Sequence, residues 1–151
     1  MCEIIFRGKE KNTKKWVHGG YASKSETTYA FAEDYEKKPV ETKHYIVADE
    51  MTDWGLPNKL VCYEVIPETI GQYTGLKDKN GVKIFDGDIC LFDPGKEERA
   101  NFVVGWCEGG WMVEGNGQDD IDELDGFFCV RCEVIGNIHD NPELRFKEGS
   151  T

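Results

Sequence analysis

This sequence of 151 residues has no long apolar run. No stretch approaches the roughly 20 apolar residues that a membrane-spanning helix needs. The N-terminus also lacks the basic start and apolar segment of a secretory signal. These two absences predict a cytoplasmic protein without membrane association, whose six cysteines are reduced.

Positive charge is scarce. Lys and Arg together number 18 against 29 for Asp and Glu, which gives a net charge of −11. Residues 1–50 sum to zero, residues 51–100 to −3 and residues 101–151 to −8. Binding to nucleic acid usually needs clustered Lys and Arg. The charge therefore disfavours a nucleic-acid partner and suits a basic protein partner.

Residues that commonly carry catalysis are also few. Serine occurs three times, and no phosphate-binding or dinucleotide-binding glycine pattern is present. None of the three histidines, His18, His44 and His139, adjoins a familiar nucleophile motif. We therefore predict a protein that is not an enzyme, with no catalytic residue, no metal ligand and no cofactor.

One pair of carboxylates keeps an enzymatic alternative open. Asp86 and Asp88 could act as a general acid and base, with His139 as a further candidate. They flank Gly87 in a segment that indicates a bend, and acidic pairs are common in turns. We expect a structural role, with a carboxylate-based or metal-dependent hydrolase as the alternative.

The closest approach to a metal motif is Cys129-Val130-Arg131-Cys132. Zinc sites usually need a second ligand pair, and Cys107 or His139 would each supply a single ligand. The apolar alternation places both cysteines in one strand, where odd spacing sends the thiols to opposite faces. We expect ordinary strand packing, with metal binding or redox activity as alternatives.

Extended structure dominates what is present. Helical periodicity is weak, and 17 glycines punctuate the chain. We expect one helical turn within residues 49–58 and tight turns at 78–81 and 109–110. Short strands joined by tight turns normally close into a small barrel or sandwich. The expected strands are 4–7, 16–21, 28–32, 43–48, 60–65, 70–76, 89–92, 101–107, 111–113 and 128–134.

The turn chemistry around residue 80 has a structural explanation. Gly75, Gly81 and Gly87 permit positive φ or close backbone approach. Asp78 can accept hydrogen bonds from the amides of its own turn. We favour this backbone role over the alternative, a binding surface.

An acidic stretch occupies residues 115–126. It does not follow the spacing of a helix-loop-helix calcium loop. A solvated loop is expected, and a weak cation site or a docking surface for a basic partner is the alternative. Its carboxylates are Asp119, Asp120, Asp122, Glu123 and Asp125.

Four aromatic residues could in principle stack on bases: Trp16, Tyr73, Trp106 and Trp111. No basic stripe accompanies them. Core or interface packing is therefore the favoured role.

Three blocks of sequence are distinctive: residues 64–89, the opening segment 6–20 and the closing segment 133–144. In their content and order these blocks resemble the YopX family of phage and prophage proteins. The resemblance implies a phage, prophage or plasmid origin, a C-terminal SH3-like β-barrel module and assembly into homo-oligomers. It implies no reaction.

These arguments predict a mostly β protein with little helix. Residues 1–66 would form an N-terminal β-hairpin region and residues 67–151 a small SH3-like β-barrel. We expect a non-enzymatic phage or prophage accessory protein that acts as a homo-oligomeric binding or assembly module. The alternatives are an acidic nucleic-acid mimic that binds a host DNA-binding protein, and the hydrolase considered above.

Overall fold

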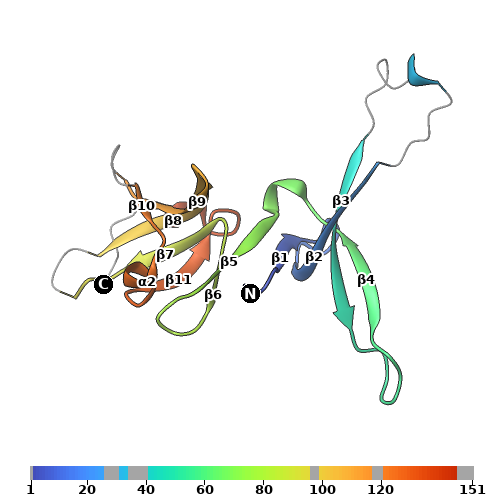
Figure 1. The fold of residues 1–151 in the computed structure, drawn as a ribbon, viewed down its shortest axis with the longest axis horizontal. Coiled ribbons are helices and arrows are strands. Elements are labelled where there is room, and N and C mark those ends of the chain that lie inside the picture. The colour runs from blue at the N-terminus through green and yellow to red at the C-terminus, as the bar shows by residue number, and fades with distance from the viewer. Residues whose placement is uncertain (1, 26–30, 34–40, 96–98, 117–120, 146–151) are drawn as a thin grey trace. The chain divides into compact units, whose positions relative to one another are not determined.

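The computed structural model describes residues 2–25, 31–33, 41–95, 99–116 and 121–145. The chain is mostly β, and its strands pair antiparallel (Figure 1). It divides into two compact units. The N-terminal unit is Ile5–Ile70, and the C-terminal unit combines Met1–Ile4 with Gly71–Thr151.

The N-terminal unit is a meander of four strands in the order β4-β3-β2-β1. Each strand pairs with the next along the chain, so every connection is a hairpin. Its elements are β1 (Phe6–Lys9), β2 (Trp16–Ser25), β3 (Thr42–Glu50), β4 (Lys59–Glu64) and the 3-10 turn η1 (Pro67–Thr69).

The base of this meander is tied together by backbone hydrogen bonds. The Ile66 amide donates to the Lys9 carbonyl and the Lys11 amide to the Glu64 carbonyl, each at 2.9 Å. Beyond this base, β2, β3 and β4 extend as a thin sheet. Among the described residues of the unit, Ile46 and Val65 are the only buried hydrophobic side chains.

The helical turn expected within residues 49–58 is wrong. Strand β3 runs on to Glu50, which pairs with Lys59 of β4, so only a turn remains between the strands. Gly55 takes a φ of +83° and Pro57 follows, and neither favours a helix. The expected strand 28–32 lies mostly outside the described residues.

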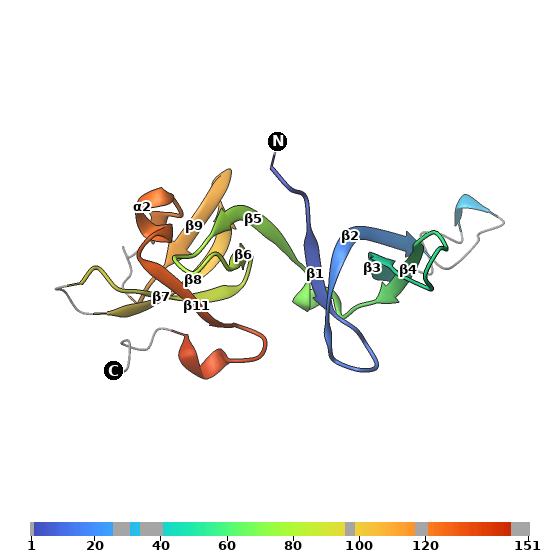
Figure 2. The same cartoon turned by 90° about the horizontal axis from the view of Figure 1, so that it is seen from below.

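The C-terminal unit carries a five-stranded antiparallel sheet in the order β10-β9-β8-β7-β11, with the β5–β6 hairpin beside it (Figure 2). Its elements are β5 (Gly71–Lys77), β6 (Lys83–Phe85), β7 (Asp88–Phe92), β8 (Ala100–Cys107), β9 (Gly110–Glu114), β10 (Ile121–Glu123), α2 (Gly126–Cys129), β11 (Cys132–Asn137) and η2 (Pro142–Leu144).

This sheet is not a closed barrel, contrary to the expectation. Strands β10 and β11 are its two ends, and no hydrogen-bonded ladder joins them among the described residues. The helical turn α2 stands between them in sequence and packs against β5 and β11. An open edge can be covered by such an element as well as by closure.

The expected strand 128–134 begins too early. Residues 126–129 form α2, because the Asp125 carboxylate caps the turn by accepting from the Phe128 amide at 2.9 Å. Strand β11 starts only at Cys132.

The β8–β9 turn is also displaced by one residue from the expected 109–110: Glu108 and Gly109 occupy it with positive φ.

A single core fills the C-terminal unit. Its side chains come from β6, from strands β7, β8, β9 and β11 of the sheet, from the residue after β10 and from α2. Three of them are thiols. The buried members are Ile84, Cys90, Phe102, Val104, Val113, Leu124, Phe128, Cys129 and Cys132.

The carboxylate of Asp78 fastens the β5–β6 turn to β11. Its Oδ1 accepts from the amides of Asn80 (2.8 Å) and Val82 (2.9 Å), and its Oδ2 accepts from the Val134 amide at 2.9 Å. Asp78 is only 6% exposed, and Gly81 closes the turn with a φ of +81°. The expected turn and the expected role of Asp78 are both confirmed.

We expect Asp78→Ala to lower the free energy of unfolding by roughly 2–4 kcal/mol, because three partly buried backbone hydrogen bonds lose their acceptor. Chemical denaturation followed by circular dichroism measures this. Asp93→Ala is the matched control: Asp93 caps the exposed turn at Gly95, and its loss should cost less than about 1 kcal/mol. Equal losses in the two variants would contradict the anchoring role.

The core also predicts thiol reactivity. Cys90, Cys129 and Cys132 are buried, whereas Cys2, Cys62 and Cys107 are exposed. Burial raises the pKa of the Cys129 thiol to about 11, so this thiol stays protonated at pH 8. At pH 8 a maleimide should label Cys2, Cys62 and Cys107 at once and the three core thiols only on unfolding, as read by mass spectrometry. Rapid labelling of Cys129 in the folded protein would contradict this.

Candidate functional site

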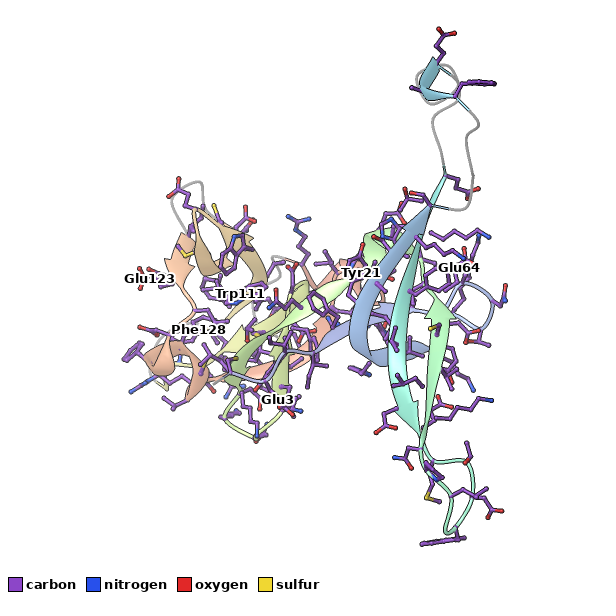
Figure 3. The ribbon with its side chains drawn as sticks, turned by 45° about the vertical axis from the view of Figure 1, so that its right-hand side comes forward. Glu3, Tyr21, Glu64, Trp111, Glu123 and Phe128 are labelled. Atoms are coloured by element: carbon purple, nitrogen blue, oxygen red, sulfur yellow. The ribbon has the colours of Figure 1, made fainter. Side chains whose placement is uncertain are left out.

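A pocket of about 540 Å³ opens on the C-terminal unit. Strands β7 to β10 and the turn α2 supply its walls. Figure 3 labels Glu123 and Phe128, which come from β10 and α2 and lie on the same side of this unit. The lining residues are Phe92, Phe102, Met112, Ile121, Asp122, Glu123, Asp125, Phe127 and Phe128.

Phenylalanine rings make the floor of the pocket. The ring of Phe92 stacks on that of Phe128 with centroids 4.9 Å apart, and Phe102 meets Phe128 edge-on at 5.4 Å. Phe127 lies 6.5 Å from Phe92 and is 61% exposed. The floor is thus partly core and partly open aromatic surface.

Three carboxylates make the rim. Asp122 and Glu123 belong to β10, an edge strand that pairs with β9 from Ile121 to Glu123. Asp125 is held at the start of α2 by its capping bond. The strand pairing and the cap together place these three acidic residues among those that line the pocket.

One arginine already uses this aromatic surface. The Arg131 guanidinium lies 3.9 Å from the Phe127 ring centroid, and its Nη1 donates to the Phe127 carbonyl at 2.9 Å. A ring face attracts a cation through its quadrupole. Aromatic faces beneath carboxylates suit a cationic group, because both attract positive charge.

A second candidate surface is the outer edge of β4 in the N-terminal unit. Strand β4 is the last strand of its sheet. Leu60 is 71% exposed, and the adjoining turn exposes Met51, Trp54 and Leu56, with Trp54 at 86%. Contiguous apolar exposure of this kind marks interaction surfaces.

The two cysteines of the Cys-X-X-Cys motif were expected on opposite faces of one strand, and this expectation is wrong. Cys129 ends α2 and Cys132 begins β11, and both thiols are buried in the same core. A hydrogen bond with Cys132 and burial raise the pKa of Cys90 well above its usual value. Packing is the role that these positions support.

One carboxylate of the acidic pair, that of Asp88, has a visible structural function. Asp88 is 1% exposed and its Oδ2 accepts from the Phe85 amide at 2.8 Å, which shapes the β6–β7 bend. The Asp86 amide donates to the Gln72 carbonyl. Both aspartates therefore lie in the bend predicted for them.

The histidines are not brought together into a cluster. His18 lies in β2 opposite Arg7, and His44 in β3 hydrogen-bonds the Tyr21 hydroxyl through Nδ1 at 2.6 Å. His139 follows β11 in the other unit, where its amide donates to Asn137. Within the described ranges, no group of three or more His, Cys, Asp or Glu side chains is placed to hold a metal ion.

The aromatic residues considered for base stacking make contacts within their own units. Trp106 and Trp111 pair across β8 and β9 with centroids 5.0 Å apart. The rings of Tyr73 and Phe85 pack at a tilt with centroids 5.6 Å apart. The Arg7 guanidinium carbon lies 4.6 Å from the centroid of the Trp16 ring.

Part of the acidic stretch forms the pocket rim. Asp122 and Glu123 were expected in a loop and lie in β10. Asp119 and Asp120 lie outside the described residues. The floor was missed, because Phe92 and Phe128 were assigned to strands and Phe127 was assigned to no element. The signal that could have revealed it is Asp125, a good helix cap directly before Gly126 and two phenylalanines.

No helix in the part of the chain that the structure describes is both long enough and apolar enough to cross a membrane.

Among comparisons with known proteins, a family model identifies the family. No curated protein matches the chain. A solved structure, protein EF1440 from Enterococcus faecalis, is similar with a TM-score of 0.53 and 22% identity over 95% of this chain and 99% of that one. Likeness at that identity shows the fold alone. The model for YopX protein matches residues 5–145, nearly the whole chain, and the protein therefore belongs to the YopX family.

Proposed function

We propose that this protein is a non-enzymatic accessory protein of phage or prophage origin. It acts in the cytoplasm as a homo-oligomeric binding or assembly module. We also propose that residues 67–151 form an SH3-like module, an idea supported by short antiparallel strands joined by tight hairpins. The buried hydrogen bonds made by Asp78 and Asp88 support structural rather than catalytic roles for these carboxylates.

The observation that carries self-association is the thin N-terminal unit. Two buried hydrophobic side chains among its described residues are few for a unit of this length, since small domains need most of their apolar surface covered. A second copy that pairs along β4 would cover Leu60 and complete the open side of the sheet. The proposed dimer contact is therefore β4 against β4 of another copy.

Hydrogen-bond alternation identifies the groups available for this pairing. The Val65 amide donates inward to the His44 carbonyl of the β3 side at 2.9 Å. Because inward and outward groups alternate along an antiparallel edge strand, the amides of Leu60 and Cys62 point away from β3. Proline at position 62 therefore removes an outward donor and leaves the β3–β4 hydrogen bonds in place.

We expect Cys62→Pro to reduce the oligomer to monomers, because it interrupts the outer edge of β4. Light scattering coupled to size exclusion at tens of micromolar protein measures the mass. Cys62→Ser is the matched control, which loses the thiol but keeps the amide and should stay oligomeric. Leu60→Lys, a charge on the exposed edge, should act in the same direction as the proline.

Two results would reject this proposal: a wild-type protein that is monomeric under these conditions, or Cys62→Pro with unchanged mass and an unchanged circular dichroism spectrum.

A second candidate is favoured by the charge of residues 101–151, which is −8. An acidic protein of this kind can imitate nucleic acid and occupy a host DNA-binding protein.

If the protein is such a mimic, it should displace labelled duplex DNA from a purified basic nucleoid protein, and displacement should weaken as salt rises from 50 to 200 mM. Fluorescence anisotropy of the DNA reports the competition, with bovine serum albumin as an acidic control protein. No displacement at the lower salt concentration would exclude mimicry of that DNA-binding protein.

A further inference from the structure

We infer that the pocket of the C-terminal unit binds an arginine side chain presented by a basic segment of a partner protein. This inference rests on the proposed binding role and is independent of self-association. The pocket volume of about 540 Å³ falls within the ordinary range for ligand sites. What selects the ligand is the chemistry of the floor and of the rim.

The floor favours a flat cation. Phe127 presents a largely exposed ring at the mouth, and Phe92 continues the aromatic surface inward toward Phe128. A guanidinium is planar and weakly hydrated, so it stacks on such rings at lower desolvation cost than an ammonium. Arg131 over Phe127 is an arginine contact of this type within the same unit.

The rim selects the sign of the ligand's charge. Asp122, Glu123 and Asp125 stand around the opening, and a carboxylate or phosphate ligand would meet their repulsion. Arg131 is a basic residue that contacts a lining residue, and its guanidinium already packs on the Phe127 ring. A single carboxylate can also accept two parallel N–H groups of an arginine guanidinium.

A partner protein is the source that the surroundings favour. The strong negative charge of residues 101–151 would attract a segment with several basic residues over a distance, before one arginine enters the pocket. A free small cation gains little from that extended field. The occupant that uses both features is an arginine within a basic peptide segment.

The test is direct titration of the full-length protein with fluorescent peptides. One peptide carries three arginines separated by Gly-Ser spacers, and a matched peptide carries citrulline, the uncharged isostere, at the same positions. Anisotropy at 50 and 150 mM salt should show binding of the arginine peptide and at least tenfold weaker binding of the citrulline peptide. A lysine version should bind more weakly than the arginine version.

Variants then separate the pocket from the general field. Asp122→Asn with Glu123→Gln should weaken arginine-peptide binding about tenfold. The control pair Glu133→Gln with Glu143→Gln removes the same charge from the same unit outside the pocket and should change binding less than twofold. Phe127→Leu keeps an exposed apolar side chain but loses the ring, and should weaken binding about threefold to tenfold.

Three outcomes would overturn the inference. The arginine peptide could bind no better than the citrulline peptide. The pocket pair and the control pair could lose affinity equally, which would indicate charge attraction alone. Free arginine amide could bind as tightly as the peptide, which would indicate a site for a small cation. Light scattering on the same samples reports self-association separately, so failure of one proposal leaves the other measurable.

Discussion

The C-terminal unit depends on a carboxylate that is hidden from water. Asp78 gives one oxygen to the amides of its own turn and the other to the Val134 amide of β11. The Lys79 amide adds a bond to the Cys132 carbonyl at 3.1 Å. These bonds fix the turn of the β5–β6 hairpin to the last strand of the sheet. Ile84 of the same hairpin is buried in the core that also holds the three thiols.

The two units use their apolar residues in opposite ways. In the C-terminal unit rings and aliphatic chains converge on one core, so the surface left over can specialise. In the N-terminal unit Trp54 and Leu60 face solvent, while Ile46 and Val65 are buried. This contrast is why the proposed self-association is assigned to β4 and the proposed ligand recognition to the pocket.

The pocket comes from a departure from the predicted strand pattern. The cap at Asp125 converts the predicted start of a strand into α2, which turns Phe127 toward the pocket and buries Phe128. The same change brings Cys129 and Cys132 into one core. Local propensity favoured a strand there, because aromatic and β-branched residues follow one another. The capping carboxylate and the tertiary contacts of α2 outweighed that preference.

The sequence alone determined the family, the mostly β class and the chemistry of the tight turn at Asp78, because turn residues and alternation act through neighbours along the chain. It also revealed where negative charge accumulates. Tertiary structure decided that the sheet stays open and that α2 forms where the last strand was expected to begin. It also decided that Phe92 and Asp122 line one pocket. The open sheet and the pocket depend on contacts between residues distant in sequence, which no local pattern encodes. The turn α2 also has a local signal in its Asp125 cap.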